Sequence, residues 1–173
     1  MLAKGKLKIF RKLLKNTKQQ HIYAPMNGEV VSLDEVPDPV FSGRMMGEGV
    51  AIIPKDGTIC APVHGQVIQI APTKHAIGIA AQDGTEILIH VGLETVSLKG
   101  EGFKLQVSKG DVVSVGQPLL TYDLEYIRAH AKSTITPIVV TNISDGNRKI
   151  EMTKEKEGIV GKTVIITVLT DKK

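Results

Sequence analysis

The fold follows most directly from residues 75–90, which read HAIGIAAQDGTEILIH. Two apolar runs flank Asp83-Gly84, and an Asp-Gly pair in that setting is the strongest short-range signal for a β-hairpin. If these two residues form the turn, His90 lies opposite Ile77. Because residues two apart in a strand share a face, His75, Ile77 and His90 would then point the same way. The sequence thus predicts a hairpin that carries two imidazoles on one face.

The two histidines are the first candidates for chemistry. In the expected register they are diagonal neighbours, with Cα atoms roughly 7–8 Å apart. A pair of imidazoles on a sheet suits either a metal ion or a phosphoryl group, and the spacing does not distinguish the two. The same spacing also fits two ordinary half-buried residues. A slip of one residue in the register would move His90 to the opposite face.

Composition restricts the fold and the class of site. A chain of 173 residues is long enough for one domain with a substantial core. Aromatic residues make up only 3%, so valine and isoleucine must fill the interior, which favours sheet over helix. The single cysteine, Cys60, excludes an internal disulfide and a cysteine-based zinc site. With no signal peptide or long apolar run apparent, we expect a cytoplasmic protein.

The positive charge is concentrated at the N-terminus. Residues 1–20 contain seven basic side chains and no acidic one, which leaves 15 basic and 18 acidic residues in the rest of the chain. Leu7, Phe10, Leu13 and Leu14 recur at helical spacing within this segment. Two interpretations fit: an amphipathic helix in which residues 1–18 contact the inner face of an anionic membrane, or a solvated, flexible terminus. No basic stripe with interleaved aromatics follows, so we expect no nucleic-acid partner.

From residue 21 to residue 173 the pattern is that of one all-β domain. Short apolar or alternating runs are separated by turn signals such as Asp83-Gly84, Lys109-Gly110-Asp111 and Asp145-Gly146, which is typical of an antiparallel β-sandwich or barrel. One short helix is expected at Leu124–Ala131, with Asp123 as its N-cap. Residues 22–30 recur 37 positions later as residues 59–67, both with the pattern Ala-Pro-x-x-Gly-x-Val. This repeat predicts a pseudo-symmetric, duplicated β architecture of the barrel-sandwich hybrid type.

Six further motifs occur in order between Val36 and Ile138, and together they resemble the glucose-type IIA component of the bacterial phosphoenolpyruvate-dependent sugar phosphotransferase system. They are VPDPVF (36–41), MGEG (46–49), PTKHAIG (72–78), IHVGLETV (89–96), LKGEGF (98–103) and STITPI (133–138). The resemblance covers roughly Tyr23 to Thr170. It implies an antiparallel β-sandwich. It also implies a monomeric phosphorelay protein that needs no cofactor. The phosphocarrier HPr would donate the phosphoryl group, and a IIB domain of a sugar permease would receive it.

By that resemblance His90 is the phosphorylated residue and His75 stabilises the phosphate. A neutral imidazole is nucleophilic near neutral pH, so the chemistry agrees. We expect a backbone carbonyl near Gly92 to hold the other ring N–H of His90, and the hydroxyl of Thr73 to orient His75. A plain β-forming role for Thr73 is the alternative. Docking should use an apolar rim flanked by acidic charges. Its expected residues are Asp38, Val40, Phe41, Ala71, Ile77, Leu88, Glu94 and Val96.

Two other function classes fit less well. A biotinyl or lipoyl carrier needs a lysine at a hairpin tip in a short Met-Lys-Met or Asp-Lys context, and Lys74 beside His75 provides neither. A LytM-type zinc peptidase needs a His-x-His pair, and position 88 is leucine. Two imidazoles leave tetrahedral zinc two ligands short. No metal is therefore obligatory, although a regulatory zinc shared by His75, His90 and a partner's carboxylate stays open.

Overall fold

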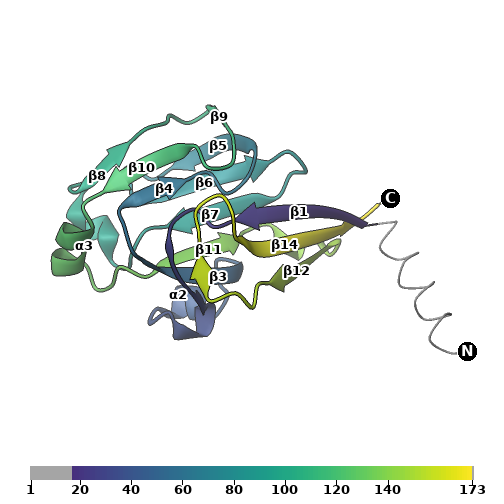
Figure 1. Cartoon of the computed structure of the whole chain (residues 1–173), viewed down its shortest axis with the longest axis horizontal. Coiled ribbons are helices and arrows are strands. Elements are labelled where there is room, and N and C mark those ends of the chain that lie inside the picture. The colour runs from purple at the N-terminus through teal and green to yellow at the C-terminus, as the bar shows by residue number, and fades with distance from the viewer. Residues whose placement is uncertain (1–16, 173) are drawn as a thin grey trace, which may run out of the picture.

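The computed structural model describes residues 17–172, which form antiparallel sheets throughout (Figure 1). The largest sheet has eight strands in the order β13-β2-β3-β11-β7-β6-β5-β9. These strands are β13 (Glu157–Gly158), β2 (Gly28–Ser32), β3 (Glu48–Pro54), β11 (Thr136–Val140), β7 (Glu86–His90), β6 (Ala76–Ala81), β5 (Gly65–Ile70) and β9 (Val112–Val113). The prediction of an all-β fold with antiparallel pairing is confirmed.

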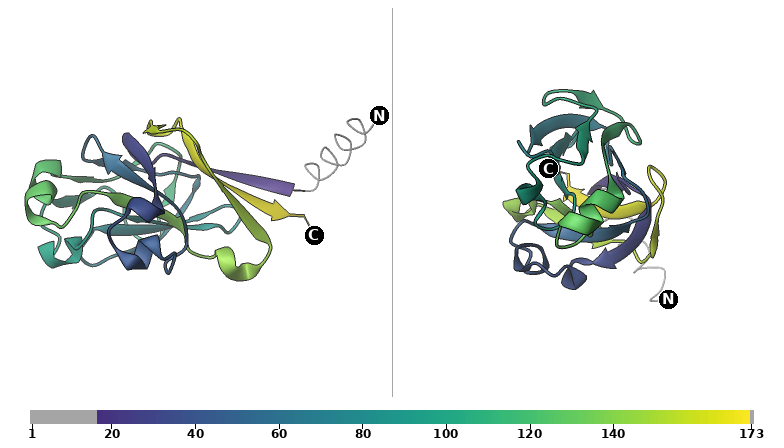
Figure 2. Two further views of the ribbon diagram at one scale, coloured as in Figure 1. Left: turned by 90° about the horizontal axis from the view of Figure 1, so that it is seen from below. Right: turned by 90° about the vertical axis from the view of Figure 1, so that its left-hand side faces the viewer.

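Two three-stranded sheets complete the sandwich, and Figure 2 gives their arrangement from two further sides. One has the order β1-β14-β12, with β1 (Thr17–Tyr23), β14 (Val164–Asp171) and β12 (Arg148–Met152). The other has the order β4-β10-β8, with β4 (Thr58–Cys60), β10 (Pro118–Tyr122) and β8 (Phe103–Leu105). Because Thr17 pairs with Asp171, both ends of the described chain lie at one end of the molecule.

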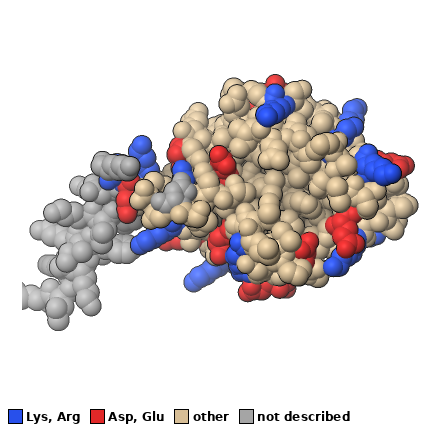
Figure 3. Space-filling model, turned by 180° about the vertical axis from the view of Figure 1, so that it is seen from behind, with Lys and Arg blue, Asp and Glu red and all other residues tan. Residues whose placement is uncertain are grey.

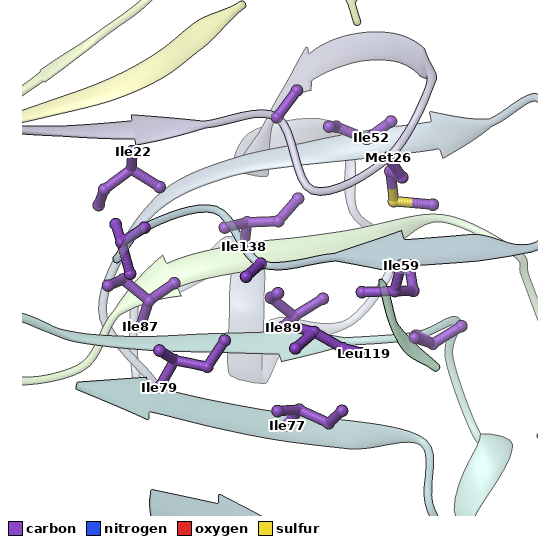
Figure 4. Close-up of a cluster of buried hydrophobic side chains, with 14 of the residues drawn as sticks. Ile22, Met26, Ile52, Ile59, Ile77, Ile79, Ile87, Ile89, Leu119 and Ile138 are labelled. Atoms are coloured by element: carbon purple, nitrogen blue, oxygen red, sulfur yellow. The ribbon is translucent and has the colours of Figure 1, made fainter. Parts of the chain in front are cut away.

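Isoleucine and valine form the main core, as the scarcity of aromatic residues predicts. Ile77 and Ile79 of β6 and Ile87 and Ile89 of β7 point to the same side of the large sheet (Figure 4). There they meet side chains of both small sheets, including Ile22 and Leu119. The opposite face of the large sheet is partly covered by residues 33–41, through a second cluster that contains Leu33, Phe41 and Val139.

Helices are short and lie between strands. The helix α3 (Leu124–His130) begins where expected, and the carboxylate of Asp123 accepts a hydrogen bond from the Tyr126 N–H at 3.0 Å. The four-residue helix α2 (Pro39–Ser42) is capped by Asp38, whose side chain accepts from the Val40 N–H at 2.9 Å. Single 3-10 turns occupy Leu33–Glu35, Thr95–Leu98 and Ile143–Asp145. Among residues 17–172 no helix is long and apolar enough to cross a bilayer.

The internal repeat does produce a pseudo-symmetric pair. The Tyr23 N–H donates to the Pro62 carbonyl at 2.9 Å, and the equivalent Cys60 N–H donates to the Pro25 carbonyl at 2.7 Å. These two hydrogen bonds are reciprocal, because Tyr23 and Cys60, like Pro25 and Pro62, are 37 residues apart. The Ala24 and Ala61 carbonyls likewise accept from Gly161 and Gly116. The two copies therefore pack directly against each other near the centre of the sandwich.

The expected boundary of the N-terminal segment at residue 20 needs correction. Residues 17–20 belong to β1, where Lys18 pairs with Thr170 and Gln20 with Val168. The sequence of this strand is polar, so a search for apolar runs does not find it. The strand is recognised only by its pairing with β14, whose sequence alternates between apolar and polar residues. The membrane contact expected for residues 1–18 falls almost entirely on residues 1–16, which lie outside the described part of the chain.

Candidate functional site

The hairpin of β6 and β7 is present, but its register differs by one residue from the expected one. Ala76, and not Ile77, lies opposite His90. The loop has three residues, because the Gly84 N–H donates to Ala81 and the Ala81 N–H to Thr85, with Gly84 at φ 87°. The Asp83 carboxylate accepts from both the N–H and the hydroxyl of Thr85. Asp-Gly thus sits at the end of a type I turn with a bulge, and not in the two-residue turn.

The register moves His90 to the face opposite Ile77, yet the two imidazoles still meet. Their ring centroids are 4.8 Å apart in an edge-to-face arrangement. His75 precedes β6 and follows a turn in which Lys74 has φ 62°. At this bend the alternation of faces along the strand no longer fixes the direction of the side chain. The two rings are neighbours, as predicted, but the bend at Lys74 brings them together and not the alternation of faces along the strand.

Each ring is held through its Nδ1 atom. Nδ1 of His90 lies 2.8 Å from the Gly92 carbonyl, and because a carbonyl only accepts, the neutral ring carries its proton on Nδ1. Nε2 of His90 is then left with a free lone pair. Nδ1 of His75 lies 2.7 Å from the Thr73 hydroxyl. If that hydroxyl donates, the proton of His75 resides on Nε2, which becomes a hydrogen-bond donor beside His90.

The surroundings favour the uncharged forms of both rings. Burial lowers the pKa of His90, although the Gly92 carbonyl and the charge of Asp38 act in the opposite direction. Burial also lowers the pKa of His75, and the neighbouring His90 lowers it further, because two cations at this distance repel each other. The lowered pKa of His90 therefore favours the neutral, nucleophilic imidazole near neutral pH.

Comparison with known proteins identifies the family of the chain. A family model described as phosphoenolpyruvate-dependent sugar phosphotransferase system, EIIA 1, matches residues 20–146. The chain belongs to this EIIA family. It is 52% identical over 163 residues to the PTS system glucose-specific EIIA component of Bacillus cereus, covering 92% of this chain and 98% of that protein. The Staphylococcus aureus protein of the same name is 48% identical over 161 residues, covering 93% of this chain and 96% of that protein.

A solved structure extends the similarity to three dimensions. The glucose permease IIA of Mycoplasma capricolum superposes with a TM-score of 0.80 at 39% sequence identity. The match covers 87% of this EIIA chain and 96% of that one. The similarity in sequence and the similarity in fold therefore agree on the family.

The expected docking rim divides into exposed and buried members. Val40 and Val96 are 37% and 58% exposed, Glu94 is exposed, and Asp38, Ala71 and Leu88 are half-buried. Ile77 is only 1% exposed and lies in the main core, so its placement on the rim is wrong. The cause is the register, since the one-residue shift turns Ile77 away from the face of His90.

Phe41 is also buried, at 4% exposure, and contacts His90 instead of solvent. Its ring centroid lies 5.0 Å from that of His90, at an interplanar angle of 58°. Its position follows from α2, which carries it over the second core cluster. Met45 and Met46, in the turn after α2, are both exposed and add apolar surface next to this helix.

His75 is only 8% exposed, and His90 is half-buried. A cleft of about 520 Å³ lies between β2, β3 and residues 152–156, and neither His75 nor His90 lines it. Figure 3 shows that a broad area of one side of this EIIA domain carries few charged side chains at its centre. Among residues 17–172 no cluster of three or more His, Cys, Asp or Glu side chains is arranged to hold a metal.

The lowered histidine pKa values predict how stability depends on pH. Between the pKa of the folded protein and about 6.5, the unfolded chain binds more protons at positions 75 and 90 than the folded one does. The free energy of unfolding should therefore fall as the pH is lowered through this window. Urea denaturation in steps from about pH 8 to about pH 5 measures the slope. The variant with both His75→Gln and His90→Gln should lose much of it, and an equal slope in that variant would contradict the prediction.

Proposed function

We propose that this EIIA domain relays a phosphoryl group between proteins, with Nε2 of His90 as the atom that carries it. The observation that supports this most directly is the 2.8 Å hydrogen bond between Nδ1 of His90 and the Gly92 carbonyl. It commits the proton of the neutral ring to Nδ1 and leaves the lone pair of Nε2 for attack. The family and the names of the relatives support a role in sugar uptake.

Phosphoryl transfer to His90 forms one nitrogen–phosphorus bond and breaks another. The lone pair of Nε2 attacks the phosphorus atom of a phosphohistidine on the phosphocarrier HPr. The nitrogen–phosphorus bond on HPr breaks, and its imidazole leaves with the bonding electrons. His90 keeps its proton on Nδ1 throughout, held by Gly92. In transfer to the IIB domain of a glucose-type permease, a nucleophilic side chain of that domain attacks the phosphorus atom. The bond between phosphorus and Nε2 breaks, and the neutral His90 ring leaves with the bonding electrons.

The protein contributes position and charge stabilisation, because phosphoryl transfer passes through a loose, in-line transition state. His75 is placed to donate from Nε2 to the oxygens of the transferring group, with the Thr73 hydroxyl fixing its tautomer. Phe41 packs against His90 and limits the freedom of its ring. Fixed donors of this kind cost no reorganisation during the reaction.

The docking surface for both partners is the exposed rim around this pair. Val40 and Val96 supply apolar contact, and Asp38 and Glu94 supply negative charge. A partner with a complementary basic patch would be steered toward His90. Each rim residue alone resembles ordinary surface. Two observations connect the rim to the reactive ring: the charge of Asp38 acts on the pKa of His90, and Phe41, next to Val40, contacts the ring. The corresponding site of action is the cytoplasmic side of the membrane, where the permease presents its IIB domain.

Reconstitution tests the proposed function. The purified protein is incubated with phosphoenolpyruvate, enzyme I and HPr, and the labelled residue is mapped. We expect one acid-labile phosphate per chain, on Nε2 of His90. Label that survives acid, or label on another residue, would overturn the proposal. Omission of HPr serves as the control, and it should leave the protein unlabelled.

A further inference from the structure

Two buried threonines hold the peptide unit that follows the strand of His90. The hydroxyl of Thr95 donates to the Val91 carbonyl at 2.7 Å. On the other side of the same peptide, the Gly92 N–H donates to the hydroxyl oxygen of Thr136 at 3.4 Å. Both threonine side chains are 0% exposed. The peptide between Val91 and Gly92 is therefore fixed at its carbonyl and at its N–H by groups that water does not reach.

The next peptide unit carries the carbonyl that contacts His90. Gly92 accepts from Nδ1 of His90 through this carbonyl, while the Leu93 N–H of the same peptide donates to Ser133 at 2.9 Å. A donor and an acceptor on one peptide polarise each other, so the Ser133 contact strengthens the Gly92 carbonyl as an acceptor. Thr136 adds a second anchor in this region, because its hydroxyl donates to the Thr134 carbonyl at 3.1 Å.

Gly92 itself explains why the segment needs such anchors. It has φ 70°, in the left-handed region, and a Cβ atom there would lie 2.8 Å from both the Ser133 oxygen and Cγ2 of Thr95. Only glycine fits, and glycine leaves the backbone free to rotate unless its neighbours restrain it. Thr95 and Thr136 restrain the backbone before Gly92, and the Ser133 contact restrains it after Gly92, so together these contacts limit the directions that the Gly92 carbonyl can take.

We propose that Thr95 and Thr136 are positioning residues that set the tautomer of His90 by fixing the direction of the Gly92 carbonyl. The proposal rests on the proposed function, since the tautomer matters because Nε2 is the attacking atom. When the Gly92 carbonyl turns away, the proton of the neutral ring is free to move to Nε2, which removes the lone pair. The hydrogen bond made by one ring nitrogen determines which nitrogen of a histidine is protonated.

The test compares Thr95→Val and Thr136→Val with the corresponding serine variants. Valine keeps the shape and removes the hydroxyl, whereas serine keeps the hydroxyl. The ¹⁵N chemical shifts of the His90 ring, measured on the neutral form without any phosphoryl donor, report the tautomer directly. We expect the valine variants to shift Nδ1 and Nε2 toward the other tautomer and to slow phosphoryl uptake by up to about tenfold, the effect of one net hydrogen bond. The serine variants should keep wild-type values.

A matched control separates positioning from stability. Thr85 is also 0% exposed, and its hydroxyl donates to Asp83 at the far end of the same hairpin. Thr85→Val should lower the melting temperature but leave the His90 shifts and the rate of uptake unchanged. If a valine variant fails to fold, Thr95→Ala and Thr136→Ala remove the hydroxyl without adding a methyl group beside the peptide.

The outcomes distinguish the two proposals. Folded Thr95 and Thr136 variants with wild-type ring shifts would overturn the positioning role, whatever their rate of uptake. Wild-type protein that takes up no phosphate, together with altered ring shifts in the valine variants, would overturn the proposed function and leave the positioning role intact.

Discussion

We expect the His90→Gln variant to take up no acid-labile phosphate from phosphorylated HPr. Nε2 of His90 is the one ring nitrogen of this residue whose lone pair is free, because Nδ1 donates to the Gly92 carbonyl. The amide nitrogen of glutamine has no comparable lone pair and does not attack phosphorus. Glutamine does retain an N–H that can reach the Gly92 carbonyl, so the segment after β7 keeps a partner. The expected effect on transfer is complete loss, measured by labelling with phosphoenolpyruvate, enzyme I and HPr.

Two other histidines give matched controls for this variant. His64 and His130 are both exposed and sit elsewhere in the fold, in the loop before β5 and at the end of α3. His64→Gln and His130→Gln should each take up phosphate like the wild type. Thermal unfolding of all three variants checks that they are folded. Full labelling of His90→Gln would place the phosphorylated residue elsewhere and remove the basis of the mechanism.

Most of the fold could be predicted from local sequence patterns. The apolar runs on either side of Asp83-Gly84 located β6 and β7, and Asp123 located the start of α3. These features depend on residues close together in the chain. The repeat also predicted pseudo-symmetry, because Ala-Pro-x-x-Gly-x-Val fixes the same backbone shape twice. The reciprocal hydrogen bonds between Tyr23, Pro25, Cys60 and Pro62 confirm that prediction.

The register of the central hairpin could not be read from its turn alone. Asp-Gly occurs both in two-residue turns and at the end of three-residue loops, and these differ by one residue in pairing. Here the side chain of Asp83 accepts two hydrogen bonds from Thr85, which favours the longer loop. That choice decides which face Ile77 occupies. The three-residue loop, with its contacts between Asp83 and Thr85, therefore goes with a register that places Ile77 in the core and not on the rim.

The contact between the two histidine rings was predicted from the sequence, but not its structural cause. The sequence placed them together through strand alternation, whereas the structure brings them together through the bend at Lys74. The contact of Phe41 with His90, like the anchoring of Gly92 by Thr136, joins residues more than 40 positions apart. Contacts of that range arise from the packing of sheets, and no local pattern records them. The resemblance to a family pointed to the two histidines, the Gly92 carbonyl and Thr73, but not to the contacts of Phe41 and Thr136.

The His75→Gln variant should remain folded, yet both accept and release the phosphoryl group about 10²-fold more slowly, the typical cost of removing one fixed donor from a developing negative charge. His75 lies with its ring centroid 4.8 Å from that of His90 and is only 8% exposed, so it acts at short range in a poorly solvated position. Its Nδ1 is occupied by the Thr73 hydroxyl, which leaves Nε2 as the atom that faces the reaction.

Glutamine at position 75 has an amide N–H but not the same reach or the fixed direction of an imidazole held by Thr73. Single-turnover transfer from phosphorylated HPr, and from the phosphorylated variant to a IIB domain, separates chemistry from association when the partner is saturating. The expected loss lies in the saturating rate and not in the affinity. The variant His21→Gln, which changes a histidine of β1 outside the site, is the control. Saturating rates equal to those of the wild type in both directions would show that His75 does not stabilise the transferring group.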